Sequence, residues 1–434
     1  MERPVCSHEP ALRHRRRFFL AATFSSLRHS NYRMFFFGQM ISLIGTWMQM
    51  TAQGWLVYEL TGSKVMLGVV GMVGTLPLAL LSPLGGFAAD RFPRRSVLLV
   101  TQSCAMVMPL VLSALVLTGA VRVWHVALLA GFLGVVNAFD MPTRQSFAIE
   151  MVGREDLMNA IGLNSGIFNT ARIVGPALAG ITMASIGIGY CFMLNGLSYI
   201  AVVAALAMMD VPGTGTRERS GSFLRQIAGG FSYVKKDARL SGLLGLLAVV
   251  SVFGFSYTSL LPAFGRDVFR VGPRDYSLLL TFNGIGALTG ALVVATFGNR
   301  RRGKRQVLLA GIALFCVAIS AFSLTRALAA GLTSLLLAGA GMIMFMTTAN
   351  TLIQSTVPDE YRGRVMGIWT FVFGGAMPVG AICAGTVAHY IGVSLTVRLG
   401  AAVSIMMAAA AAITARRLKP LPAPGYVPGP ESPY

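Results

Sequence analysis

The sequence is poor in charged residues and poorest in acidic ones. Only 12% of its 434 residues are charged, about half the share of a soluble domain. Its five cysteines lie far apart, so the chain has neither a zinc-binding spacing nor a CxxC redox motif. It also lacks a Walker phosphate-binding motif, an HExxH motif and a Ser/His/Asp set. We therefore expect a protein that is not an enzyme and that needs no metal and no cofactor.

What the sequence offers instead is a series of long apolar segments. Hydrophobic residues make up 55% of the chain, and a membrane-spanning helix needs about 20 consecutive apolar residues. The prediction is an all-α membrane protein with twelve transmembrane helices. We place them at about 34–60, 65–89, 96–119, 123–147, 158–186, 190–209, 241–266, 275–298, 306–325, 328–352, 362–388 and 393–415.

The longest polar connection divides these segments into two sets of six. It is basic and contains a segment, 223–234, that can form an amphipathic helix at the membrane surface. The arginine-rich start of the chain is followed by too short an apolar run for a signal peptide. The predicted units are a cytoplasmic arm at 1–33, a six-helix bundle at 34–209, a cytoplasmic linker at 210–240, a second six-helix bundle at 241–415 and a Pro-rich, disordered tail at 416–434.

The positive charge is arranged as the orientation rule for membrane proteins expects. A net charge of +20 on a soluble protein would indicate nucleic acid as a partner. Here the basic residues lie between apolar segments, with 28 on the side of the two termini and seven on the other side. We therefore predict a multi-pass protein of the cytoplasmic (inner) membrane, with both termini in the cytoplasm and no nucleic-acid partner.

The two halves share an internal repeat. Gly162, Gly175 and Gly180 are followed 205 positions later by Gly367, Gly380 and Gly385. Parallel repeats of six helices are one known plan of secondary transporters. The repeat predicts two pseudo-symmetric bundles, although a chance match in a glycine-rich chain is the alternative.

The connection between the second and third apolar segments resembles a family signature. It reads Gly86-Phe-Ala-Ala-Asp90-Arg91-Phe-Pro93-Arg94-Arg95, similar to the signature loop of the major facilitator superfamily, with Pro93 where that family usually has glycine. The resemblance implies the fold of that family and a gating latch of ion pairs at a cytoplasmic helix end. We assign the latch to Asp90, Arg91, Arg94, Arg95, Asp140 and Arg144. For Arg95, simple obedience to the orientation rule is the alternative.

The fifth segment resembles the Gly-Pro motif of exporting members of that superfamily. The matching residues are Gly166, Gly175, Pro176 and Gly180, and Ala171 replaces one glycine of the motif. The resemblance implies export, whereas close packing of helices explains the small residues without it. Segments such as Asn31-Tyr-Arg-Met-Phe-Phe-Phe-Gly-Gln and Phe139-Asp-Met-Pro-Thr-Arg-Gln are similar to the branch that contains the enterobactin exporter and drug efflux proteins.

Polar residues within the apolar segments are the candidates for a substrate cavity. Five on the first segment are spaced three or four residues apart and share one helix face: Gln39, Ser42, Thr46, Gln49 and Gln53. Such a face lines either water or a neighbouring helix to which it hydrogen-bonds. Further candidates are Asn169, Arg172, Tyr257, Asn283 and Trp369. Arg172 suits an anionic cargo or a structural ion pair.

Acidic residues in the apolar segments are few. The resemblance to the superfamily implies that Asp90, Arg94 and Asp140 form one cluster. We expect Asp140 to be able to titrate during transport, because burial and nearby arginines act on its pKa in opposite directions. Glu59 and Asp267, near the outer face, are expected to be solvated.

Together these features predict a secondary transporter that works by alternating access. We expect it to export a small amphipathic or aromatic molecule, of the drug or siderophore class, in exchange for protons and as a monomer in the lipid bilayer. The alternatives are an importer or lipid flippase of the same fold, or a membrane scaffold without transport.

Overall fold

The structure, a computed structural model, describes residues 24–209, 231–235, 237–298 and 303–417. In these ranges the chain is almost entirely helical, and eleven helices are long and apolar enough to cross a membrane. The prediction of an all-helical, multi-pass membrane protein is confirmed. The long helix Ser30–Thr61 is not among the eleven, because its polar side chains lower the mean hydropathy.

The first half of the described chain contains one short turn of 3₁₀ helix and six long helices. They are η1 (Ser25–Arg28), α2 (Ser30–Thr61), α3 (Lys64–Arg91), α4 (Arg94–Leu117), α5 (Val123–Val152), α6 (Leu157–Ser185) and α7 (Ile188–Met208). Their ends lie within about five residues of the predicted segments, since an apolar run long enough to cross a bilayer is the strongest signal in such a sequence.

The second half begins with an irregular helix that changes its hydrogen-bond pattern twice. It consists of α9 (Ala238–Val249), η2 (Val250–Gly254), α10 (Tyr257–Ala263) and η3 (Phe264–Val268). Both η segments are π-helical, with Phe255 N donating to Val250 O at 2.8 Å and Phe269 N to Phe264 O at 3.0 Å. Such turns often occur at functional sites. The remaining helices are α11 (Pro273–Phe297), α12 (Gly303–Leu324), α13 (Leu328–Thr356), α14 (Asp359–Ile391) and α15 (Val393–Arg417).

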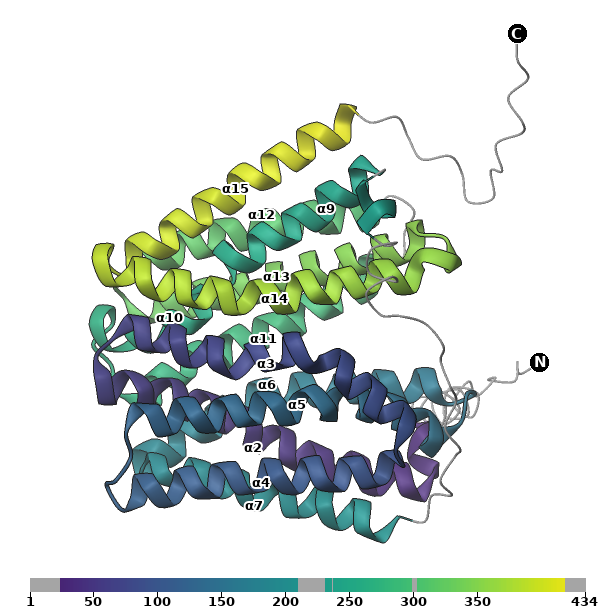
Figure 1. Ribbon diagram of the computed structural model, residues 1–434. Helices are drawn as coiled ribbons and strands as arrows, with labels where there is room; N and C mark the ends of the chain where they lie inside the picture. Colours follow the sequence, from purple (N-terminus) through teal and green to yellow (C-terminus); the bar gives the residue numbers. More distant parts are fainter. Residues whose placement is uncertain (1–23, 210–230, 236, 299–302, 418–434) are drawn as a thin grey trace, which may run out of the picture.

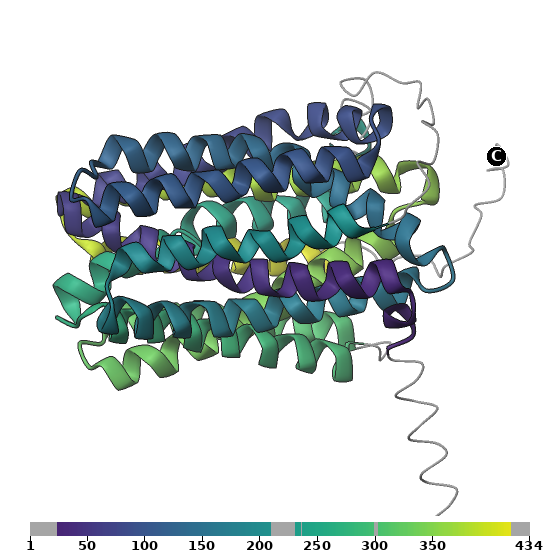
Figure 2. The same cartoon turned by 90° about the horizontal axis from the view of Figure 1, so that it is seen from below.

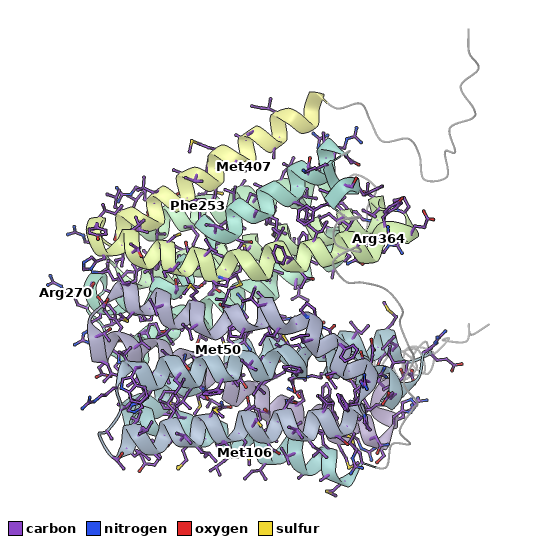
Figure 3. The ribbon with its side chains drawn as sticks, in the orientation of Figure 1. Met50, Met106, Phe253, Arg270, Arg364 and Met407 are labelled. Atoms are coloured by element: carbon purple, nitrogen blue, oxygen red, sulfur yellow. The ribbon has the colours of Figure 1, made fainter. Side chains whose placement is uncertain are left out.

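The helices run along one common direction, so the molecule has two ends (Figures 1 and 2). We call the end that carries residues 24–29, 92–93, 153–156 and 357–358 the terminal end, because the described chain begins there at Phe24 and ends there with the last turn of α15 (Figure 1). The opposite end carries the short connections at 62–63, 118–122, 186–187, 269–272, 325–327 and 392. Figure 3 shows Arg364 at the terminal end and Arg270 at the opposite end.

Two helix pairs join the halves of the chain. α3 packs against α14, and α6 packs against α11. Figure 1 shows α3 and α14 close together toward the opposite end and separated at the terminal end. α3 contains Pro77 and Pro83, and a proline within a helix removes a backbone donor and permits a bend.

The repeated glycines occupy matching environments in the two halves. A Cβ at Gly175 would lie 2.5 Å from Trp47 Cβ of α2, and one at Gly380 would lie 2.5 Å from Val252 O of the irregular helix. Gly180 and Gly385 face the helices that join the halves, α11 and α3, while Gly162 and Gly367 have no atom within 4 Å of such a Cβ. The repeat in the sequence therefore corresponds to a repeat in packing.

Close helix contacts within each half depend on further glycines. A Cβ added at Gly286 of α11 would lie 1.8 Å from Leu336 O of α13, a backbone atom that cannot turn away. We expect Gly286→Ala to lower the free energy of unfolding by about 1 kcal/mol, since overpacking costs about 1–3 kcal/mol and the better helix propensity of alanine offsets part of it. Denaturant unfolding in detergent measures this change. Gly242→Ala is the control, because a Cβ there has no atom within 4 Å, and it should stabilise the protein. A Gly286 variant as stable as the Gly242 variant contradicts the close contact.

Several predicted features fall at the edge of what the structure describes. Of the expected amphipathic segment, only residues 231–234 are within the described ranges, and they are helical. Of the expected tail at 416–434, residues 416 and 417 belong to α15, and the rest lies outside the described residues. Of the expected arm, residues 25–29 dock on the start of α6: Ser25 Oγ and the His29 ring donate to the Asp156 carboxylate at 2.6 and 2.8 Å. These hydrogen bonds hold the pKa of Asp156 below its ordinary value.

Candidate functional site: polar groups inside the helical assembly

The polar face of α2 is turned mainly toward α7. Gln49 Oε1 accepts a hydrogen bond from Asn195 Nδ2 at 2.5 Å, and the Thr46 hydroxyl lies 3.4 Å from Tyr199 Oη. Gln39 and Ser42 are buried, and only Gln53 and Thr46 are partly exposed. In this conformation the alternative of hydrogen bonds between helices describes the face better than a cavity wall does.

Glycines explain why α2 and α7 lie so close together. A Cβ at Gly45 would lie 2.5 Å from Ser198 Oγ, and one at Gly38 would lie 2.9 Å from Ala201 O. Small residues on one face allow two helix backbones to approach, and polar side chains then bond across the contact. The spacing of the polar residues correctly predicted that they share one face of α2. It did not indicate that α7 would pack against this face.

Arg172 of α6 is the centre of a second polar group, which joins the two halves. Its Nη2 donates to Asn283 Oδ1 of α11 at 2.9 Å, and Asn283 Nδ2 donates to Tyr257 Oη of α10 at 2.8 Å. The guanidinium carbon lies 5.9 Å from the centre of the Trp47 ring of α2. Three of the predicted cavity residues, Arg172, Asn283 and Tyr257, are thus in direct contact.

The other two predicted cavity residues have different surroundings. Asn169 lies one turn before Arg172, is partly exposed and donates to Ser165 O at 2.8 Å. Trp369 of α14 is 8% exposed and packs in the large apolar core. The structure therefore brings Asn169 near the Arg172 group and places Trp369 among apolar side chains instead of at a polar wall.

The residues of the predicted latch do not form the expected single cluster. Arg94 pairs with Glu150 of α5, and Asp140 pairs with Arg144 on its own helix. Arg91 is exposed and lies over the Phe87 ring. Within the described ranges, no hydrogen bond or ion pair is found for Asp90. The expected Asp90–Arg94–Asp140 cluster is therefore wrong for this conformation, because Glu150 lies near Arg94 and satisfies its charge.

Asp140 is the most deeply buried acidic residue of the group, with 1% of its surface exposed. Its carboxylate also accepts hydrogen bonds from Thr101 Oγ1 at 3.0 Å and Gln102 Nε2 at 2.6 Å. Gln102 Oε1 and Arg144 Nε are buried and have no partner among the described residues. The cluster therefore holds a charged pair together with polar atoms that remain free to change partners.

Arg95 makes contacts beyond those that the orientation rule requires. Its Nε and Nη2 donate to Leu206 O and Ala207 O, each at 2.7 Å. These are carbonyl groups in the last turn of α7, where a positive charge is favourable. Arg95 therefore fastens the start of α4 to the end of α7.

A link at the opposite end was missed by the sequence reasoning. Asp267 accepts a hydrogen bond from Tyr58 Oη at 2.6 Å and lies 3.2 Å from Lys64 Nζ, so it ties η3 to α2 and α3. Nearby, the Trp55 and Tyr276 rings lie 5.2 Å apart. Asp267 is therefore a partner in a contact between the halves and not simply solvated. The one signal available in the sequence was that Asp267 and Lys64, which carry opposite charges, both lie near the predicted outer face.

The Gly-Pro helix α6 has a close contact with α11 near its end and free space beside a glycine near its start. A Cβ at Gly180 would lie 1.9 Å from Ser277 Oγ of α11, whereas one at Gly166 has no atom within 4 Å. Pro176 is buried, and Phe168 is 47% exposed. On α14, Gly374 also has no atom within 4 Å of an added Cβ. The halves are thus in contact toward the opposite end, and α6 and α14 have free faces toward the terminal end.

Elsewhere, a hollow of about 330 Å³ lies between the terminal ends of α11, α12 and α13. Apart from Gln306 its lining is apolar or glycine, so it lacks the convergent polar groups of a typical binding site. No group of three His, Cys, Asp or Glu side chains that could hold a metal occurs in the part of the chain that the structure describes.

Comparison with protein families gives a match along nearly the whole chain. The family model described as "transmembrane secretion effector" matches residues 21–427. The chain is 24% identical to macrolide efflux protein A of Streptococcus pyogenes over 85% of this chain and 92% of that protein. It is 27% identical to the multidrug efflux pump Tap of Mycolicibacterium fortuitum, over 81% and 88%. It is 24% identical to the staphyloferrin A transporter of Staphylococcus aureus, over 84% and 91%.

Solved structures share the fold at low sequence identity. The nucleoside transporter NupG superposes with a TM-score of 0.74 at 13% identity, over 90% of this chain and all of that one. An inward-facing, unoccupied bacterial homologue of the human lysosomal transporter Spinster gives a TM-score of 0.69 at 14% identity, over 90% and 97%. These likenesses establish the fold of the chain and do not identify a transported molecule.

Proposed function

Because the chain belongs to the transmembrane secretion effectors of the major facilitator superfamily, we propose that it exports a small amphipathic or aromatic molecule in exchange for protons. Its relatives include efflux proteins for macrolides and for several drugs, and a staphyloferrin A transporter. Exported molecules of the drug or siderophore class are therefore the first cargoes to test.

The observation that carries this proposal is the difference between the two ends. At the opposite end, Tyr58, Lys64 and Asp267 tie the halves together. At the terminal end, Gly162 and Gly367 have open space around them, although Gly180 and Gly385, further along the same two helices, are packed. Such an arrangement supports alternating access, in which one end opens while the other closes.

The proposal includes twelve spans in two pseudo-symmetric bundles of six. α2 is the span that hydropathy alone leaves out, and one of its polar side chains, Gln49, is paired with Asn195 of α7. That is the way a polar transmembrane helix avoids exposing such groups to lipid. The terminal end, with its many basic residues, then faces the cytoplasm. In this frame the described conformation is open to the cytoplasm, and the protein acts as a monomer in the inner membrane.

Asp140 is the carboxylate best suited to carry the proton. It is buried, it lies within a spanning helix, and its partner Arg144 has an unused buried Nε. Protonation of Asp140 would release Arg144 and allow the surrounding polar groups to pair differently, which is the kind of local charge change that biases a two-state element.

Transport measured in cells tests the proposal. Cells that express the protein and are loaded with fluorescein or rhodamine 123, two aromatic dyes of opposite charge, are expected to lose at least one of the dyes faster than control cells, and a protonophore should abolish the difference. In a cysteine-free background, Ser165→Cys should react with a membrane-impermeant maleimide added from the cytoplasmic side. Dye or siderophore movement that is unaffected by the protonophore would exclude proton exchange, and labelling of Ser165→Cys from the outside alone would reverse the proposed orientation.

A further inference from the structure

Arg172 is a positive charge in a spanning helix that has no acidic partner. Among the described residues, the four ion pairs closer than 4.0 Å involve Asp140, Glu150, Asp156 and Asp267, and none includes Arg172. Arg172 is partly exposed, and a charge within a spanning helix that has no counter-charge is costly and marks a functional position. A negative charge brought by a bound molecule would therefore be favourable at this position.

The guanidinium of Arg172 is held in place by neighbouring side chains, although few of its N–H donors take part in hydrogen bonds with described residues. Arginine has five N–H donors, and one hydrogen bond, from Nη2 to Asn283 Oδ1, is found for it. Asn283 is itself fixed, since its Nδ2 donates to Tyr257 Oη at 2.8 Å and to Leu335 O at 3.3 Å. Trp47 lies at one side of the guanidinium. The group is thus oriented by three helices while most of its donors remain free.

Arg172 stands where the packed part of α6 meets the open part. Gly175 and Pro176, on the side of the opposite end, are buried. Ser165 and Phe168, on the side of the terminal end, are exposed, and Asn169 is partly exposed. The side chains between the terminal end and Arg172 on this helix therefore include exposed or partly exposed aromatic and polar groups.

We propose that Arg172, fixed by Asn283, is an anion-binding subsite, and that the exported molecule carries a carboxylate next to a flat apolar or aromatic part. This deepens the proposed export function and rests on it. A carboxylate matches the planar fork of arginine with two parallel hydrogen bonds. Trp47 and Phe168, whose rings lie 5.6 Å apart, supply flat contact surface beside it. Cargo selection then follows charge, with anionic molecules preferred over cationic ones of the same shape.

Binding of two dyes with one scaffold and opposite charge tests the inference. Fluorescein, which is anionic at neutral pH, and rhodamine 123, which is cationic, share a xanthene ring system. Fluorescence anisotropy is measured with the full chain in nanodiscs, and the signal of empty nanodiscs is subtracted. We expect the protein to bind fluorescein at least about tenfold more tightly than rhodamine 123, the effect of one charge-assisted interaction.

Three variants assign that preference to Arg172. Arg172→Gln should remove it, and Arg172→Lys, which keeps the charge but loses the fork, should retain part of it. Arg398→Gln is the control, since Arg398 is an exposed arginine on α15, and it should bind as the unchanged protein does. Size-exclusion profiles and thermal midpoints of all variants show whether each is folded. If the Arg172→Gln variant does not fold, the reduced preference expected for the Arg172→Lys variant still tests the inference.

The outcomes separate this inference from the proposed function. Equal binding of fluorescein by the unchanged protein and a folded Arg172→Gln variant overturns the inference, as does a preference for rhodamine 123. If chloride at physiological concentration removes all preference, Arg172 is a structural residue paired with an inorganic anion, and the inference fails. Protonophore-sensitive export of rhodamine 123 together with Arg172-independent binding would leave the export proposal standing alone. Arg172-dependent fluorescein binding without export of any probe would support the subsite and count against export.

Discussion

The Asp140→Asn variant is expected to lose about 3 kcal/mol of its free energy of unfolding, and with it export activity. Asp140 is buried and pairs with Arg144. Asparagine has nearly the same shape but no charge, so it leaves the guanidinium of Arg144 without its counter-charge inside the helical assembly. Removing one partner of a buried pair is costly for that reason, whereas removing both partners is often tolerated.

Denaturant unfolding in mixed micelles measures the effect, and two further variants show its origin. The double variant with Asp140→Asn and Arg144→Gln should recover part of the lost free energy, because it leaves no unpaired charge. Glu59→Gln, at an exposed position of α2, should change nothing. If the single Asp140 variant is as stable as the unchanged protein, the buried ion pair does not contribute as the geometry implies. A stable variant that no longer exports would instead support a role of Asp140 in proton transfer.

In the Asp267→Ala variant, the equilibrium constant between the present conformation and one with an open opposite end is expected to shift by about tenfold toward the latter. Asp267 is the acceptor for Tyr58 and the partner of Lys64, so its loss removes one anchor that holds the halves together at the opposite end. The hydrogen bond from Tyr58 should account for most of the effect, since the partly exposed pair with Lys64 is weakened by solvent. Opening of the opposite end should be accompanied by closure of the terminal end.

The rate of maleimide labelling at Ser165→Cys reports this shift. Asp267→Ala should slow the labelling from the terminal end, and Tyr58→Phe should slow it by a similar amount because it removes the same hydrogen bond. Glu59→Ala, an exposed acidic neighbour of Tyr58, is the matched control and should leave the rate unchanged. Labelling that stays fast in both the Asp267 and the Tyr58 variants would mean that the link does not help to keep the opposite end closed.

Much of the helix pattern could be read from the sequence because the membrane imposes it. A spanning segment must satisfy all of its backbone groups internally and must be long enough to cross the hydrocarbon layer. Because of these two requirements, each spanning segment is a long apolar run, and the observed helices begin and end close to the ends of these runs. The irregular hydrogen bonding at 250–254 and 264–268 was not foreseen, because a π-helical turn leaves no periodic signal in an apolar run.

The choice of ion-pair partners could not be predicted in the same way. Asp90, Arg94 and Asp140 are of the right types to form a cluster, yet Arg94 pairs with Glu150. Which carboxylate lies within reach of an arginine depends on the rotation and tilt of two helices that are remote in sequence. Tyr58 and Asp267 likewise meet across 209 positions of the chain, which no local pattern indicates.

The sequence by itself determined which segments are helices, which of them carry polar residues on one face, and which family the chain belongs to. These properties follow from local composition, spacing and motifs. Only the tertiary structure decided what each polar face meets: the face of α2 meets Asn195 of α7, and Arg172 meets Asn283. Helical periodicity fixes how side chains are placed around one helix, but the packing of all helices fixes how that helix is rotated. The link between the halves at the opposite end, where Tyr58 meets Asp267, is for the same reason a property of the assembled protein.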